Sequence, residues 1–133
     1  MIVADASVIT KWFKPDEKSP EADRFLDEHV AGRATIFVPI LLLYELTNAL
    51  YVSEKLTKEE IEKAISAFFD LRLTHLNPDK EFLSNVLQIS DLAHISTYDA
   101  SYVALAQMLK CPLVTADRKL YKNTHTFIEI VLL

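Results

Sequence analysis

The stretch Ile2-Val3-Ala4-Asp5-Ala6-Ser7 opens the chain with a short apolar strand that ends at an acidic residue and runs into a helix. Pro15 stops that helix, which we expect over residues 7–14. Further apolar strands, expected at residues 35–38, 72–76, 112–115 and 127–132, alternate with helical segments. Short apolar strands between helices are typical of a parallel sheet covered on both faces. We therefore predict a single domain over residues 1–133, an α/β fold built as a three-layer α/β/α sandwich with a mostly parallel central sheet.

Capping residues and prolines mark where the other helices begin. Ser19 is expected to cap a helix that ends near Gly32, and Pro39 to begin a helix through Glu54. A capping box at Thr57–Glu60 and the pair Asn77-Pro78 are each expected to begin a further helix. Thr97 is expected to cap a helix through Leu109. The helix after Pro39 is apolar on most faces, so we expect it to be largely buried.

Composition excludes several classes of protein. The 133 residues include 14 basic and 19 acidic side chains, a net charge of −5 that argues against coating nucleic acid by bulk electrostatics. The single cysteine, Cys111, cannot form an intrachain disulfide. The longest apolar run, Ile36 to Tyr44, is too short to span a bilayer, and no basic leader precedes an apolar segment. We expect a soluble, untargeted, cytoplasmic protein with no membrane association.

Four carboxylates occupy positions where an α/β sheet binds ligands. Asp5 and Asp117 follow strands, and the carboxyl ends of parallel strands open on one crevice. Glu45 interrupts a helix that is otherwise too apolar to face water, and Asp99 lies in the first turn of an inner helix. Taken singly, each has an ordinary alternative. Asp5 or Asp117 can be a cap or turn residue, Glu45 can mark a solvated edge or pair with a lysine, and Asp99 is favoured by the helix dipole.

Convergence of the four acids would require a cation, because adjacent carboxylates raise one another's pKa values. Carboxylate oxygens select hard ions, so the set predicts Mg²⁺ or Mn²⁺. The four histidines, His29, His75, His94 and His125, have no zinc-ligand spacing. Hydrolysis of a phosphodiester is the natural chemistry of such a site. Nearby cations and aromatic rings could bind the substrate or lie on ordinary surface or in the core: Lys11, Lys14, Arg118, Lys119, Lys122, Trp12, Tyr98 and Tyr121.

Four segments in this order resemble the PIN domain, and in particular VapC-like toxins of type II toxin–antitoxin systems. They are residues 2–7, residues 38–50 with Glu45-Leu46-Thr47-Asn48, Tyr98-Asp99-Ala100 with Ala104-Leu105-Ala106, and Leu113-Val114-Thr115-Ala116-Asp117. The resemblance implies an α/β/α nuclease fold and a Mg²⁺- or Mn²⁺-dependent endoribonuclease with Asp5, Glu45, Asp99 and Asp117 as metal ligands. It also implies a Thr115 hydroxyl near the site, a homodimer, and inhibition by a VapB-like antitoxin. Residues 92–96 lack the glycine that is common before Tyr98-Asp99.

Other functions compete with the toxin. A housekeeping RNA-processing PIN nuclease would carry the same acids. A response-regulator receiver needs an acidic pair after the first strand, where this chain has only Asp5, and a haloacid-dehalogenase-type phosphatase needs an aspartate at Ser7. A non-catalytic module that binds RNA or a protein partner has no need to hold four repelling carboxylates together.

Overall fold

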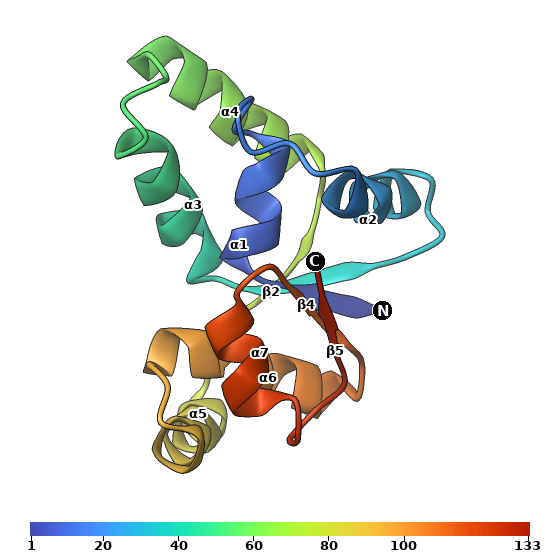
Figure 1. Cartoon of the computed structure of the whole chain (residues 1–133), viewed down its shortest axis with the longest axis vertical. Coiled ribbons are helices and arrows are strands. Elements are labelled where there is room, and N and C mark those ends of the chain that lie inside the picture. Colours follow the sequence, from blue (N-terminus) through green and yellow to red (C-terminus); the bar gives the residue numbers. More distant parts are fainter.

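Five short parallel strands form the central sheet, in the order β3-β2-β1-β4-β5 (Figure 1). The computed structural model describes all residues, 1–133. The elements are β1 (Ile2–Ala4), α1 (Ala6–Ile9), the 3-10 helix η1 (Thr10–Trp12), α2 (Pro20–Val30), β2 (Ile36–Pro39), α3 (Leu42–Tyr51), α4 (Lys58–Asp70), β3 (Thr74–Leu76), α5 (Lys80–Ala93), α6 (Thr97–Leu109), β4 (Leu113–Thr115), α7 (Arg118–Thr124) and β5 (Ile130–Leu132). No helix combines the length and apolar character that a membrane crossing requires.

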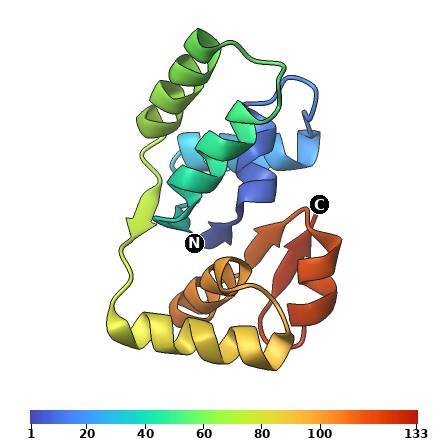
Figure 2. The ribbon, with the colours of Figure 1, turned by 90° about the vertical axis from the view of Figure 1, so that its left-hand side faces the viewer.

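Helices cover both faces of the sheet, which confirms the predicted three layers. Helices α1 to α4 lie on one side and α5 to α7 on the other (Figures 1 and 2). The chain moves outward from β1 through β2 to β3 and then returns to β4 on the opposite side of β1. Ligands of open α/β sheets bind where the strand order reverses, here between β1 and β4. A receiver domain has the order 2-1-3-4-5 instead, so the receiver alternative is wrong.

The core forms where small apolar side chains let a helix approach the sheet closely. Helix α6 packs against β1, β2 and β4. Its buried side chains are mostly small or β-branched: Ala100, Tyr102, Val103, Ala104, Leu105 and Ala106. This packing confirms that α6 is an inner helix, and it brings the N-terminal turn with Asp99 to the sheet edge.

The helix after β2 differs from the prediction. Pro39 is the last residue of β2, and the amide of Ile40 donates to the Leu76 carbonyl at 3.0 Å, which keeps the chain extended. Helix α3 therefore begins at Leu42 and ends at Tyr51. Only one of its faces is buried, since the Tyr44 and Tyr51 side chains are 76% and 74% exposed. The expectation of a largely buried helix was wrong.

Capping follows the prediction in part. Ser19 caps α2, and Thr57 with Glu60 forms a capping box on α4, as expected. The cap of α5 is Asp79 rather than Asn77-Pro78, and the cap of α6 is Ser96, one residue before Thr97. In each case the residue that becomes the cap is the one with extended backbone and a side-chain oxygen in reach of the third amide of the helix.

A left-handed histidine replaces the glycine that residues 92–96 lack. His94, the C-cap of α5, has φ +53°, a conformation in which histidine is more common than most non-glycine residues. The Ser90 hydroxyl donates to the Ile95 carbonyl and closes the turn. The chain thus reaches Ser96 and the start of α6 without a glycine.

Candidate active site

Asp5 is the most buried acid at the predicted site, with 5% of its surface exposed. Its Oδ1 accepts from the Ser7 hydroxyl at 2.5 Å and from the Val8 amide at 3.2 Å, and its Oδ2 accepts from the Thr115 hydroxyl at 2.5 Å. Burial raises the pKa of Asp5 from 3.8 to about 6, and the hydrogen bonds only partly oppose that shift. The carboxylate is therefore held rigidly but is costly to ionise.

Asp117 is joined to Asp5 through the end of β4. Thr115 Oγ1, which donates to Asp5, accepts from the Asp117 amide at 2.9 Å. One carboxylate oxygen of Asp117 caps α7, accepting from the Lys119 and Leu120 amides at 2.7 and 3.1 Å, while the other accepts no hydrogen bond from the protein. Both strand-end aspartates are thus helix caps, and they also lie at the point where the strand order reverses.

Glu45 contacts a tyrosine that the sequence did not single out, and the charge of Asp99 acts on both groups. Glu45 is half-buried and accepts a hydrogen bond from the Tyr102 hydroxyl. Burial, and to a smaller extent the charge of Asp99, raise the pKa of Glu45. Burial and then the charge of Glu45 raise the pKa of Tyr102, with smaller contributions from Asp5 and Asp99. Three of the four acids therefore lie within electrostatic reach of one phenol.

No cation of the protein neutralises these acids. The five ion pairs of the structure involve none of the four predicted carboxylates. Asp99 has no ion pair, and its side chain accepts no hydrogen bond, although its amide donates to the Ser96 hydroxyl. Unpaired carboxylates at one sheet edge, with raised pKa values at Asp5 and Glu45, are the electrostatic condition that a divalent cation would relieve.

The donor set fits a hard metal ion with few protein ligands. No three Asp, Glu, His or Cys side chains are positioned to hold one ion together, so these side chains as arranged would supply an ion with at most two ligands. Mg²⁺ commonly binds through one or two carboxylates and keeps several waters. The oxygen-only chemistry agrees with Mg²⁺ or Mn²⁺, and the metal site over Asp5, Glu45, Asp99 and Asp117 stays a prediction.

Some residues considered at the rim have other roles. The Trp12 indole donates to the Ala22 carbonyl at 3.0 Å and packs against the core, which favours the structural alternative. Lys14 pairs with Glu17 at 2.7 Å. His29, one of the histidines without zinc-ligand spacing, faces the carbonyls of Ala34 and Leu71 at 3.2 and 2.8 Å, a structural role. By contrast Tyr98 is exposed at the start of α6.

Two residues of the site were missed from the sequence. Ser7 donates to Asp5 and accepts from the Ala116 amide at 2.8 Å, so it links α1 to the end of β4. Tyr102 orients Glu45. A signal for each exists: Ser7 follows Asp5 at the spacing of an ST or Asx turn, and Tyr102 is the one large polar side chain among the buried positions of α6. Neither signal identifies the partner. Ala116 and Glu45 are remote in sequence from Ser7 and Tyr102, and the contact of Ser7 with Asp5 depends on the turn that forms.

Comparison with known proteins identifies the family of this chain. The family model described as PIN domain matches residues 2–125. The chain belongs to the PIN domain family. Over 123 residues it is 27% identical to Ribonuclease VapC3 of Pyrobaculum aerophilum, an alignment that spans 90% of this chain and 91% of that protein. A segment of 28 residues, 21% of this chain and 22% of the other, is 68% identical to Ribonuclease VapC9 of Mycobacterium tuberculosis.

Solved PIN-fold structures superpose over nearly the whole chain. VapBC2 of Rickettsia felis, bound to a DNA fragment from its promoter, has a TM-score of 0.73 at 18% identity and covers 100% of this chain and 99% of its own. A toxin–antitoxin complex of Klebsiella pneumoniae has a TM-score of 0.69 at 14% identity, covering 98% and 96%. These similarities confirm the PIN fold predicted from the four motifs.

Proposed function

We propose that this PIN domain is a Mg²⁺- or Mn²⁺-dependent endoribonuclease that hydrolyses RNA phosphodiester bonds at Asp5, Glu45, Asp99 and Asp117. The observation that carries the proposal is the set of acids without cationic partners around the reversal of strand order. A binding module would gain nothing from raising the pKa values of Asp5 and Glu45 by burial. The similarity to a protein named Ribonuclease VapC3 supports the same activity.

The chain's own residues would bind and orient rather than react covalently. Asp5, Glu45, Asp99 and Asp117 are the candidate ligands, of which this arrangement would offer one ion at most two at a time. A bound Mg²⁺ or Mn²⁺ would supply an activated water and neutralise charge on the scissile phosphate. Ser7 and Thr115 fix the Asp5 carboxylate from both oxygens. Tyr102 holds one oxygen of Glu45, and Asp99 has both carboxylate oxygens free of protein donors. Such support of ligating carboxylates is typical of metal sites.

Two measurements test the proposal together. Calorimetric titration with Mn²⁺ should give binding to the wild type that is lost or much weaker in Asp5→Asn and Asp99→Asn. Structured RNAs should be cleaved with Mg²⁺ or Mn²⁺ and left intact with excess EDTA. Equal Mn²⁺ affinity in all three proteins, or cleavage that survives EDTA, would rule the proposal out.

We infer that the protein is the toxin of a toxin–antitoxin pair and that an apolar antitoxin segment binds between α3 and α4. A groove of about 580 Å³ lies there, and eight of its ten lining residues are hydrophobic. Tyr44, Tyr51 and Phe69 are exposed along it, and an exposed apolar surface of this kind marks a protein-binding site. The structural neighbours include a toxin–antitoxin complex, which supports a partner protein rather than a housekeeping role.

Charge placed in the groove should weaken the antitoxin complex. Tyr51→Lys or Phe69→Lys would remove an apolar anchor that the complex buries and would add an unpaired charge, which is expected to cost about 2 kcal/mol or roughly 30-fold in affinity. The measurement is the Kd, by calorimetry, of the complex with the cognate antitoxin that this inference requires. Val30→Lys, on the exposed side of α2, is the matched control. Unchanged affinity in both groove variants would place the antitoxin elsewhere.

We also infer a homodimer through α5. Leu83 and Leu87 lie one helical turn apart on α5 and are 52% and 64% exposed, beside an apolar pocket that includes Pro39 and Tyr98. A twofold contact buries the same apolar surface on both copies. Light scattering should therefore give twice the chain mass for the wild type and once for Leu87→Glu, with Ser84→Glu on the same helix as control. A monomeric wild type would contradict the inference.

A further inference from the structure

One face of α7 gathers cations and aromatic rings beside the carboxylates. Leu120 and Thr124, one turn apart, are buried and anchor the helix to the core. With 100° between successive residues, the side chains on the opposite face project together. These side chains are Arg118, Lys119, Tyr121, Lys122 and His125; Tyr121 is half-buried and the other four are exposed. We name this set the α7 face; it starts at Arg118, next to Asp117.

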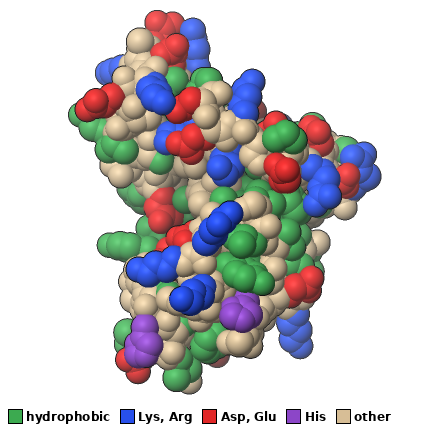
Figure 3. Space-filling view, viewed as in Figure 1, with side chains coloured by type: hydrophobic (Ala, Val, Ile, Leu, Met, Phe, Trp, Pro, Cys, Tyr) green, Lys and Arg blue, Asp and Glu red, His purple; other side chains and the backbone are tan.

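The cations of the α7 face are not neutralised by the protein. None of Arg118, Lys119 and Lys122 belongs to an ion pair, although five of the 14 basic residues of the chain do. The nearest acid, Asp117, directs one oxygen to the amides of its own helix. Figure 3 shows Lys and Arg side chains gathered over α7, next to acidic side chains. A concentration of free cations in a chain of net charge −5 indicates an anionic ligand.

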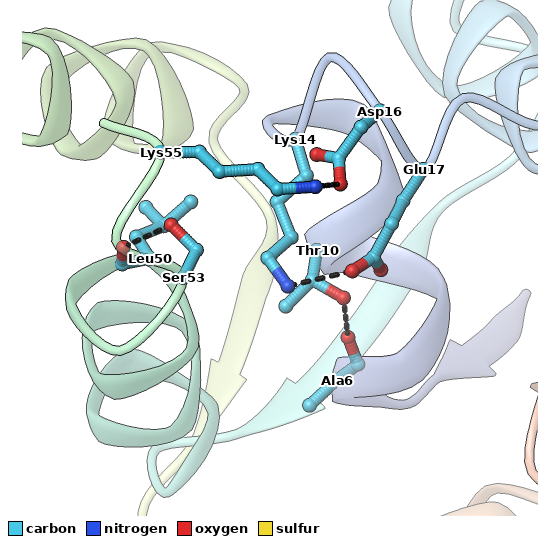
Figure 4. Close-up of polar contacts among 8 residues, drawn as sticks. All are labelled: Ala6, Thr10, Lys14, Asp16, Glu17, Leu50, Ser53 and Lys55. Carbon is cyan, nitrogen blue, oxygen red and sulfur yellow. Dashed lines mark hydrogen bonds and ion pairs between the residues drawn. The ribbon is translucent and has the colours of Figure 1, made fainter.

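Lysines on the other side of the sheet are used differently. Beyond η1, Lys14 pairs with Glu17, and Lys55 pairs with Asp16, joining the loop before α2 to the loop after α3 (Figure 4). The Lys55–Asp16 pair joins the two loops, and the Lys14–Glu17 pair is local to the loop before α2. Lys11 belongs to no ion pair but stands alone, whereas the α7 face groups three unpaired cations directly after Asp117.

The aromatic rings of Tyr121 and His125 indicate which class of polyanion the α7 face binds. The rings of Tyr121 and His125 are stacked, with centroids 5.2 Å apart and planes inclined by 20°. His125 Nδ1 lies 3.1 and 3.2 Å from the Tyr121 and Lys122 carbonyls, which fixes the ring and leaves Nε2 free. An acidic protein segment needs cations only, whereas single-stranded nucleic acid uses phosphate-binding cations together with aromatic surfaces for its bases.

We propose that the α7 face is a single-stranded RNA track that leads from the carboxylate site. Arg118, Lys119 and Lys122 bind phosphates, and the Tyr121–His125 pair stacks with a base. The seven residues of α7 extend the track over about 10 Å. The substrate class rests on the proposed ribonuclease function, but the binding itself requires no cleavage. The track thus positions RNA and takes no part in the reaction.

Anisotropy of a labelled single-stranded oligoribonucleotide tests the track in EDTA, where no cleavage interferes. Lys119→Gln/Lys122→Gln should weaken binding by about 10-fold at low salt and make the salt slope shallower by about 1.4, because two phosphate contacts are lost. Lys58→Gln/Lys63→Gln on α4 removes the same charge elsewhere and should bind like the wild type. Tyr121→Ala should weaken binding about 5-fold and Tyr121→Phe should not, because stacking needs only the ring.

Several results would overturn the track. The first is that the wild type does not bind RNA. The second is that the α4 and α7 variants lose RNA affinity equally. The third is that polyglutamate binds as tightly as RNA and loses the same affinity in the α7 variants. Failure of the nuclease proposal gives a different pattern, since RNA would then bind in an α7-dependent way without being cut. Cleavage and binding that are both indifferent to the α7 substitutions would leave the nuclease standing and remove the track.

Discussion

Replacing Asp5 or Asp117 by asparagine should lower the rate of metal-dependent RNA cleavage by about three orders of magnitude, which corresponds to ~4 kcal/mol of transition-state stabilisation. Asparagine keeps the shape and the helix cap of either residue but removes the negative charge. The two acids are joined through Thr115, so loss of either charge affects the same site. The measurement is single-turnover cleavage of one RNA at saturating Mn²⁺.

Two further variants separate the charge from its support. Asp70→Asn, on the exposed end of α4, removes a carboxylate far from the sheet edge and should cleave like the wild type. Tyr102→Phe removes only the hydroxyl that holds Glu45, and should weaken metal affinity about 10-fold, as loss of a supporting hydrogen bond commonly does. A cleavage rate of Asp5→Asn within 10-fold of the wild type would contradict the assignment of Asp5.

The same Asp5→Asn substitution should stabilise the metal-free protein. Burial raises the pKa of Asp5 from 3.8 to about 6, so ionisation at neutral pH costs the folded state up to about 3 kcal/mol at 1.36 kcal/mol for each pKa unit. Asparagine avoids that cost. The Ser7 and Thr115 hydroxyls can each donate or accept, so they can adapt to the amide.

The raised pKa of Asp5 determines how the stabilisation by Asp5→Asn depends on pH. Between the unfolded pKa of Asp5 and its folded value of about 6, the folded state binds more protons, so wild-type stability falls as pH rises through that window. The gain from Asp5→Asn should therefore be nearly absent below the unfolded pKa and complete above the folded one. The measurement is urea unfolding in EDTA at about pH 3.5, 5, 6 and 7, values that span the window between the unfolded and folded pKa values of Asp5. Asp117→Asn is the control, and a gain independent of pH would refute burial of the Asp5 charge as its cause.

Sequence alone determined the fold class and the positions of the four acids. Apolar strands at β1, β2 and β4 and the helices between them require a covered parallel sheet, because such strands have no polar face for water. The same alternation of strands and helices places Asp5 and Asp117 at the ends of strands. Strong local signals such as Ser19 and the Thr57–Glu60 box also predicted helix starts correctly, since caps act over three residues.

Only the tertiary structure decided which side chains meet. Strand order brings Asp5 to Thr115, 110 residues later, and α6 packing brings Tyr102 to Glu45. The start of α3 likewise depends on pairing of Pro39 with Leu76 in a neighbouring strand, which local propensity cannot report. The sequence showed the four carboxylates. It did not show how deeply each is buried, that none has a cationic partner, or that hydroxyl groups donate to Asp5 and Glu45. These properties depend on distances through space, and a linear pattern carries no such distances.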